Sequence, residues 1–232
     1  MFTSVTIGND ITAIGEYVFC DCSSLASITI GDGVTSIGYR AFYNCSSLTS
    51  VYISDIAAWC NISINTYGSP FNYAHNLYLN NELVTNVTIP DGVTKIGKGA
   101  FAYNSNLKTI TIPSSVTVIG ASAFEDCDNL KSVTISDGVK TIGDGAFYSC
   151  NALQSVTIPN SVTKIGASAF QNCTKLGSVF CKATTPPSID SGTFANNNDE
   201  RYIYVPSASV SAYKEANCWS GYESSIKGIN YE

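Results

Sequence analysis

Leu130-Lys-Ser-Val-Thr-Ile-Ser-Asp-Gly-Val-Lys-Thr-Ile-Gly-Asp-Gly-Ala-Phe-Tyr-Ser-Cys150 is one copy of the motif that decides the fold of this chain. The same pattern begins at Leu107 and again at Leu153, so that each copy starts 23 residues after the previous one. A fixed period of this length is the sequence signature of a solenoid, in which every repeat forms one coil. The chain is therefore expected to fold as a stack of coils.

The first half of this copy predicts a strand and a turn. Val133 and Ile135 alternate with Thr134, which is the period-two pattern of a half-buried strand. Asp137 and Gly138 then indicate a turn, because glycine tolerates positive φ and aspartate can hydrogen-bond its own backbone. We expect the strand to place its valine and isoleucine in the core and its threonine on the surface.

The second half predicts two more walls around the same core. Val139 and Ile142 are expected to point inward again. Ala146, Phe147 and Cys150 follow at the spacing i, i+1, i+4, which suits one helical or 3₁₀ turn better than a strand. One repeat would thus surround a small apolar interior on three sides.

A single coil cannot shelter this interior, since most of its apolar surface would face water above and below. Stacking like coils removes that surface from water at about 25 cal/mol per Å². Strands of adjacent coils, about 4.8 Å apart, can then form a parallel ladder. Equivalent side chains should lie above one another, and the following phenylalanines should form one row: Phe101, Phe124, Phe147 and Phe170.

The pattern Leu-x-x-Val-x-Ile-Pro-x-x-Val-Thr-x-Ile-Gly-x-x-Ala-Phe-x-x-Cys resembles the leucine-rich repeat of the BspA-like surface proteins of anaerobic, host-associated bacteria. The resemblance covers most of the chain. It implies a leucine-rich-repeat solenoid of the right-handed β/α superhelix class, built of short parallel strands and short helical or 3₁₀ turns. It also implies a protein exported to the cell surface or secreted, with a role in adhesion to host or bacterial proteins.

The repeat pattern predicts one solenoid domain over residues 1–232. Regular repeats are expected at 1–53 and at 87–181, and an enlarged, irregular repeat separates them at 54–86. Residues 182–232 are expected to form a C-terminal cap with a short helix. Such a cap shields the apolar end of a stack.

Two signals stand out in the enlarged repeat. Asp55-Ile-Ala-Ala-Trp-Cys-Asn-Ile suits a short helix with Ser54 or Asp55 as its N-cap. Leu77-Tyr-Leu-Asn-Asn-Glu-Leu-Val suits a hairpin that turns at Asn80 and Asn81. The enlarged repeat is therefore expected to remain one coil of the stack and not to mark a domain boundary.

The tail carries signals of a cap. Phe194 falls at the phenylalanine position of the repeat, and residues 202–206 resemble a final strand. A helix is expected from Pro206 to about Asn217, since Val210 and Tyr213 are at helical spacing. Trp219 and Tyr222 are expected to lie over the last coil.

Composition limits the classes of partner. Charged residues make up 13% of the chain and apolar residues 44%, which argues against disorder. The net charge is −6 and no run of lysine or arginine occurs, so nucleic acid is not expected as a partner. No membrane-spanning stretch and no signal peptide are recognisable. Because Met1 is followed at once by a repeat strand, we expect a truncated chain from which an export signal and earlier repeats were removed.

Nine cysteines are present, and five of them share one position of the repeat. Side chains stacked in register run parallel to one another, so buried free thiols are favoured over disulfides. Zinc is not expected, because the cysteines are about one period apart and His75, the one histidine, matches no ligand spacing. The cysteines do not decide between an oxidising and a reducing compartment. The five cysteines at the shared position are Cys22, Cys45, Cys127, Cys150 and Cys173.

No catalytic motif is recognisable, so we expect neither an enzyme nor a cofactor. A Ser–His or Cys–His pair could form only through His75, which is expected to lie in a surface loop. Asp32, Asp91 and Asp137 share one position of the repeat, where Ser114 interrupts the row, and a stacked acidic edge could in principle hold Ca²⁺. Asp-Gly is ordinary turn chemistry, however, and this interpretation is favoured.

The outward positions of the strands are the candidate partner-binding surface. Thr111, Thr134 and Thr157 belong to it, and Tyr52 and Phe180 stand out as aromatic residues in a row of threonines. The leading hypothesis is a non-catalytic adhesion protein that binds a protein ligand, such as host extracellular matrix or another bacterial surface protein. The alternatives are a carbohydrate-binding module, favoured by fourteen tyrosines, and a structural spacer within a longer surface protein.

Overall fold

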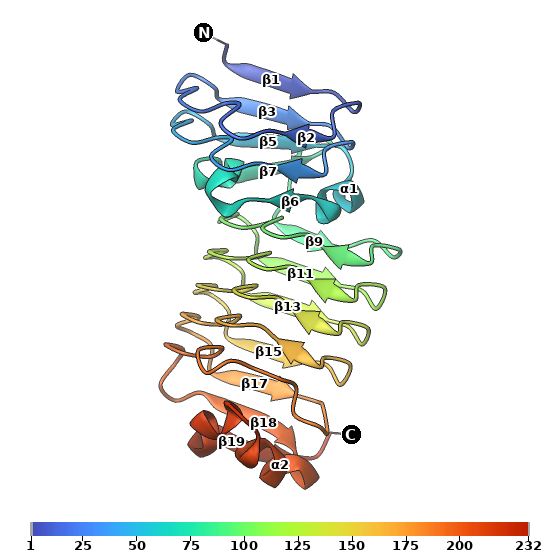
Figure 1. Ribbon diagram of the computed structural model, residues 1–232, viewed down its shortest axis with the longest axis vertical. Coiled ribbons are helices and arrows are strands. Elements are labelled where there is room, and N and C mark those ends of the chain that lie inside the picture. Colours follow the sequence, from blue (N-terminus) through green and yellow to red (C-terminus); the bar gives the residue numbers. More distant parts are fainter. Residues whose placement is uncertain (1, 232) are drawn as a thin grey trace.

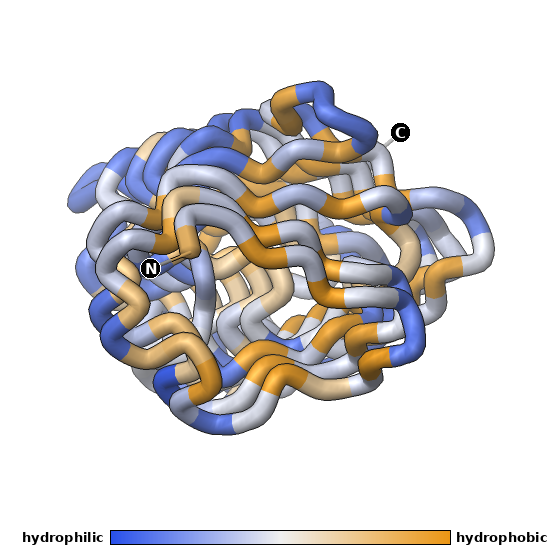
Figure 2. The backbone as a smooth tube through the Cα atoms, turned by 90° about the horizontal axis from the view of Figure 1, so that it is seen from above, coloured by the Kyte–Doolittle hydropathy of each residue, from blue (hydrophilic) through white to orange (hydrophobic). Residues whose placement is uncertain are grey.

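The protein is a stack of coils around one shared core (Figure 1). The structure is a computed structural model that describes residues 2–231, apart from the side chain of residue 66. Figure 2 looks down the long axis and shows the coils superimposed around a common interior. The fold is that of a leucine-rich-repeat solenoid, as the period of the sequence predicts.

The first wall of the stack is made of strands of three to five residues, one to each coil. Neighbouring strands pair in parallel within three sheets, and residues 23 apart lie side by side, as Thr111 and Thr134 do. The exception is the antiparallel pair β7–β8, which confirms the hairpin predicted at Asn80 and Asn81. The wall consists of β1 (Ser4–Ile7), β3 (Ser27–Ile30), β5 (Ser50–Ile53), β7 (Asn76–Leu79), β9 (Asn86–Thr88), β11 (Thr109–Ile112), β13 (Ser132–Ile135), β15 (Ser155–Ile158), β17 (Ser178–Cys181), β18 (Tyr202–Pro206) and β19 (Ile226–Ile229), with the two-residue β8 (Glu82–Leu83) at the hairpin.

The second wall is a ladder of two-residue strands. Val139 and Ile142 are fully buried, as expected, and the structure adds that Thr141 and Ile142 pair with Lys164 and Ile165 of the next coil. Strand pairing thus joins neighbouring coils on two sides over most of the stack. The strands are β2 (Ala13–Ile14), β4 (Ser36–Ile37), β6 (Ser63–Ile64), β10 (Lys95–Ile96), β12 (Val118–Ile119), β14 (Thr141–Ile142) and β16 (Lys164–Ile165).

The third wall corrects the helical or 3₁₀ turn expected at Ala146 to Cys150. The chain makes successive tight turns here, with left-handed residues two before and two after the phenylalanine. In one coil these are Ser122 (φ 54°) and Asp126 (φ 53°). The Phe124 N–H donates to the carbonyl of Ala146 in the next coil at 2.8 Å, so this wall is also bonded from coil to coil. The left-handed residues break a helix before it can form.

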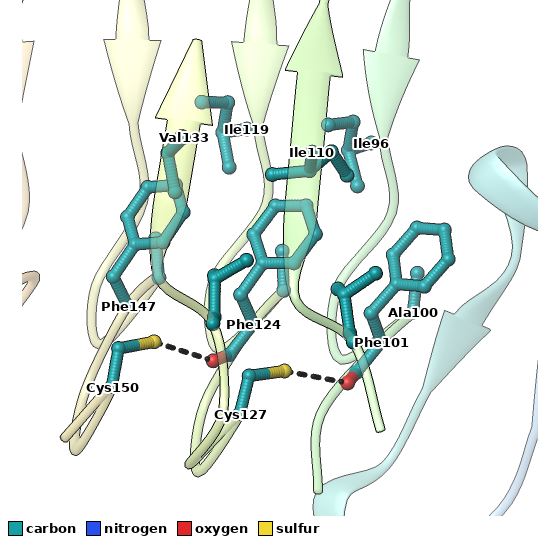
Figure 3. Close-up of a cluster of buried hydrophobic side chains, with 14 of the residues drawn as sticks. Ile96, Ala100, Phe101, Ile110, Ile119, Phe124, Cys127, Val133, Phe147 and Cys150 are labelled. Atoms are coloured by element: carbon teal, nitrogen blue, oxygen red, sulfur yellow. Dashed lines mark hydrogen bonds between the residues drawn. The ribbon is translucent and has the colours of Figure 1, made fainter. Parts of the chain in front are cut away.

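The predicted phenylalanine row is confirmed. Phe101, Phe124, Phe147 and Phe170 are buried, and successive rings are 5.1–5.4 Å apart and within 10° of parallel. Figure 3 shows the first three of these rings stacked on one another. Phe194 extends the row at 5.6 Å. The coils from Phe101 to Phe194 therefore share one aromatic column through the core.

The cysteine row lies beside this column as free thiols. Cys127 Sγ donates to the Phe101 carbonyl at 3.1 Å, and Cys150 Sγ donates to the Phe124 carbonyl at 3.2 Å (Figure 3). Burial raises the pKa of both thiols well above the ordinary range, which keeps them protonated and unreactive. Asn104 takes the place of a cysteine in its coil. Its Oδ1 accepts from the Asn106 N–H, while its buried Nδ2 has no partner among the described residues.

The enlarged coil adds α1 (Ile56–Asn61) and two 3₁₀ turns, η1 (Thr66–Gly68) and η2 (Pro70–Asn72). Asp55 is the N-cap, since its carboxylate accepts from the N–H groups of Ala57 and Ala58. Trp59 is buried in the core: it meets Phe71 edge to face, and its Nε1 donates to the Ala100 carbonyl at 2.9 Å. The irregular coil is thereby bonded to the regular coil that follows.

The C-terminal part closes the end of the column. Trp219 and Tyr222 pack on Phe194, as expected for a cap. The predicted helix is shorter than expected: η3 (Ser207–Ser209) leads into α2 (Val210–Glu215), and η4 (Trp219–Ser225) follows. The strand at 202–206, β18, is not the final strand, because β19 pairs with it in parallel.

Candidate functional site

The outward side chains of the first wall form the surface that we call the strand-lined face. Because side chains alternate along a strand, each strand buries two residues and exposes the ones between and beside them. In β13, for example, Val133 and Ile135 are buried whereas Ser132 and Thr134 are exposed. The central row of this face, in chain order, is Thr6, Thr29, Tyr52, Tyr78, Thr88, Thr111, Thr134, Thr157, Phe180 and Tyr204.

Tyr52 lies on β5, where the structure pairs it with a second tyrosine. Its ring stacks on that of Tyr78 in β7, with centroids 4.7 Å apart and planes 14° from parallel. Both side chains are half-buried. Offset stacking of this kind fixes both rings, so they present a firm aromatic surface without further loss of side-chain entropy on binding.

Thr111, Thr134 and Thr157 form the middle of the row. Thr111 and Thr134 are exposed and lie side by side on β11 and β13, and Thr157 on β15 is half-buried. Lys108 and Lys131 stand exposed beside them. This stretch is a flat surface of hydroxyl and methyl groups with positive charge at one side.

Phe180 lies on β17 and is the first of a second aromatic group. Its ring stacks on Tyr204 of β18 at 4.9 Å, and Tyr204 meets Tyr202 at 6.2 Å. The ammonium group of Lys227 lies 5.5 Å from the centre of the Tyr202 ring, at cation–π distance. The two aromatic groups thus lie toward opposite ends of the strand-lined face.

Tyr78 and Tyr204, the partners in these stacks, were not predicted as site residues from the sequence. Tyr78 could have been found, because Leu77-Tyr-Leu repeats the in–out–in pattern of Val51-Tyr-Ile in β5. Tyr204 follows a loop outside the 23-residue register, so its position beside Phe180 could not be counted from the repeat.

His75 is exposed, as expected, and its Nδ1 lies 3.4 Å from Ser105 Oγ. The described residues place no carboxylate in hydrogen-bond contact with the other ring nitrogen, which a nucleophilic triad requires. Within residues 2–231, no group of three or more His, Cys, Asp or Glu side chains could hold a metal ion.

The aspartates considered for Ca²⁺ lie in turns. Gly92 and Gly138, which follow Asp91 and Asp137, have φ of 95° and 153°, as turn glycines do. Asp32 accepts hydrogen bonds from Ser54 Oγ at 2.8 and 2.9 Å. These contacts are those of side chains that hold turns in place.

Six copies of a repeat model described as the BspA type leucine rich repeat region match residues 1–69 and 72–217. The chain belongs to this family of leucine-rich-repeat proteins. No curated protein matches it.

Three solved bacterial structures are among those similar to this chain. The pneumococcal vaccine antigen PcpA is 16% identical, with a TM-score of 0.55 over 98% of this chain and 78% of that one. A leucine-rich repeat protein from Bacteroides ovatus is 22% identical, with a TM-score of 0.48 over 87% of this chain. One from Eubacterium ventriosum is 26% identical, with a TM-score of 0.44 over 90% of this chain and 68% of that one. This chain spans 63% of the length of the B. ovatus protein.

None of the helices in the described part of the chain has the length and apolar character needed to cross a lipid bilayer.

Proposed function

We propose that this protein is a non-catalytic binding module that acts at the cell surface or after secretion and holds a protein partner against its strand-lined face. The observation that carries the proposal is the pair of stacked aromatic groups, Tyr52–Tyr78 and Phe180–Tyr204, on one face of a regular stack. Aromatic residues are enriched in protein-binding hot spots, and contacts of little energy that exclude water surround them. The family resemblance supports the location and an adhesive role.

The shape of the face supports a partner that lies along it. Its residues are held by parallel ladders and by the packed core, so little order has to be gained when a partner binds. Thr111, Thr134 and Thr157 offer hydroxyl groups between the aromatic ends. Host extracellular-matrix proteins and other bacterial surface proteins are the partner classes that the proposal names.

Binding to immobilised host extracellular-matrix glycoproteins, intact and enzymatically deglycosylated, tests this function. Thr134→Arg should weaken binding by about tenfold or more, because a bulky charge is placed in the middle of the face. Phe180→Ala should do the same by removing an anchor. Val118→Arg is the control, since Val118 is 40% exposed on β12 of the second wall.

The proposal requires that binding survive deglycosylation and respond to the face but not to the control. If Thr134→Arg and Val118→Arg weakened binding equally, the partner would contact a surface other than the strand-lined face. A well-folded protein that binds no protein ligand would favour the spacer role, in which the solenoid only separates other parts of a longer surface protein.

A further inference from the structure

The strand-lined face has a step near its N-terminal end. The central row begins with two short side chains, Thr6 and Thr29, and continues in register with two rings, Tyr52 and Tyr78. The surface therefore rises by the height of a tyrosine side chain between β3 and β5.

One face of the Tyr52 ring is open at this step. Its other face is covered by Tyr78, which stacks on it from the β7 side at 4.7 Å. Because β5 lies between β3 and β7 in the ladder, the uncovered face is turned toward Thr29 and Thr6. The ring is thus a wall that stands over a floor of small residues.

The step is closed at one side by the β7–β8 hairpin, and a groove of about 530 Å³ results. This volume is within the range of about 300–1,000 Å³ found for small-ligand sites. Hydroxyl groups of Ser27 and Thr29 lie on the floor, and the exposed amides of Asn80 and Asn81 lie at the hairpin turn. No charged side chain of the described residues lines the groove.

These groups match the chemistry of a neutral saccharide. A sugar ring has an apolar face of C–H groups, which packs on an aromatic ring, and a rim of hydroxyls that both donate and accept. Serine and threonine hydroxyls and asparagine amides also do both. A phosphate or sulfate ligand would call for arginine or lysine, and a metal ion for carboxylates, and the lining offers neither.

We propose that this groove, between the Tyr52 ring and the Asn80–Asn81 turn, binds one or two rings of a neutral saccharide. The sugar ring lies on the open face of Tyr52, and its hydroxyl groups bond to the floor and to the two asparagines. This site goes beyond the protein-binding role, because it takes a different class of ligand at one end of the same face.

A second step on the same face provides a matched control. Thr157 lies in register with Phe180, whose ring is covered on its far side by Tyr204. This step resembles the one at Thr29 and Tyr52. Among the described strands, however, only β7 and β8 form an antiparallel pair, so no such hairpin stands beside Phe180.

The test is an NMR titration of the isotope-labelled chain with cellotriose, chitotriose and, as a charged counterpart, sialyllactose. At least one neutral trisaccharide should bind with a dissociation constant of about 1 mM or tighter and shift the amide signals of Thr29 and Asn81. Thr29→Tyr should weaken binding by about tenfold or more, because the new ring stacks on Tyr52 and covers its open face. Thr157→Tyr makes the same change beside Phe180, outside the groove, and should leave saccharide binding unchanged, although it alters the face proposed for the protein partner.

Three outcomes would overturn the proposal: no neutral trisaccharide binds, sialyllactose alone binds, or both variants bind as the unchanged protein does. Thr29→Tyr introduces a residue favoured in strands, and its folding is checked by the unperturbed signals of the distant coils. Since no protein ligand is present in this experiment, its failure leaves the protein-binding role intact, and the reverse also holds.

Discussion

Asp126 lies at the left-handed position that follows the buried Phe124, with φ of 53°. Partial burial, together with the neighbouring charges of Glu125 and Asp128, raises the pKa of its carboxyl to about 6. The folded chain therefore binds a proton here more tightly than the unfolded chain does. Its contribution to stability is present at low pH and is lost as the pH rises from about 4 to about 6.

Asp126→Asn should stabilise the fold at neutral pH and leave acid stability almost unchanged. The amide carries no charge to desolvate, and asparagine tolerates the left-handed conformation well. Since the side chain is only partly buried, solvent screening limits the gain to about 1 kcal/mol. Urea unfolding at pH 3.5 and at pH 7.5 would measure the difference.

Asp137→Asn is the control for this change, because it removes the same charge from an exposed turn. Its free energy of unfolding should shift by less than about 0.5 kcal/mol at either pH. If the two variants gained equally at neutral pH, relief of the net negative charge of the chain would explain the effect, and burial of Asp126 would not.

At the scale of single residues, the sequence predicts which side chains are buried better than it predicts the backbone conformation of the turns. Phe147 and Cys150 recur at fixed spacing, so their burial follows from the period alone. The left-handed residues do not share one residue type: Ser122, Gly145 and Ser168 occupy one such position in successive coils. The left-handed conformation at this position is imposed by the neighbouring coils, which supply hydrogen bonds to the turn. No residue type in the local sequence therefore predicts it.

Among the elements, the two-residue strands of the second wall depend on glycine. Gly143 follows β14, and a Cβ atom added to it would lie 2.6 Å from the backbone nitrogen of Ala121 and 2.7 Å from the carbonyl carbon of Gly120. Both atoms belong to the preceding coil. The glycines that end these strands therefore allow neighbouring coils to approach closely.

Gly143→Ala should destabilise the fold by about 1–3 kcal/mol, because backbone atoms cannot swing aside as a side chain can. Gly8→Ala is the matched control: no atom lies within 4 Å of the added Cβ, and the effect should be within about 0.5 kcal/mol. Thermal or urea unfolding would measure both. A Gly143 variant as stable as the control would show that adjacent coils can move apart without loss.

Element prediction succeeded where a local signal was present. The hairpin at Asn80 and Asn81 follows from two residues that both accept positive φ, and both have it. The second-wall strands were missed because two residues are too few to show a period. The helical or 3₁₀ turn expected at Ala146 to Cys150 is replaced by successive tight turns, which the spacing i, i+1, i+4 also fits. Bonds such as Tyr148 N–H to the Gly145 carbonyl close these turns, and Phe147 N–H donates to the Ala169 carbonyl of the next coil.

At the scale of the whole molecule, the candidate site shows which features the repeat period can predict and which it cannot. Tyr52 and Phe180 were identified because they interrupt a row of threonines, and the row itself follows from the register. The groove beside Tyr52 could not be predicted, since it depends on where the hairpin of the enlarged coil lies. Irregular segments have no period, so their position on the stack cannot be counted from the sequence and is seen only in the folded chain.

The stack should tolerate loss of one whole coil. Deletion of residues 131–153 removes one period of 23 residues and joins Leu130 to Gln154-Ser155-Val156, which repeats the original Lys131-Ser132-Val133 context. Each remaining coil keeps neighbours of the same kind, and Phe124 meets Phe170 in the column. In a solenoid, stability is close to a sum of coil and interface terms.

The shortened chain is therefore expected to fold, to unfold cooperatively, and to have a lower urea midpoint than the full chain, because fewer coil interfaces hold it together. Deletion of residues 131–141, about half a period, is the matched control, since it places strand residues opposite turn residues of the next coil. That chain should lose cooperative unfolding and bind a hydrophobic dye. Equal behaviour of the two deletions would contradict a fold that depends on like coils lying in register, which is the property that brings the residues of the strand-lined face together.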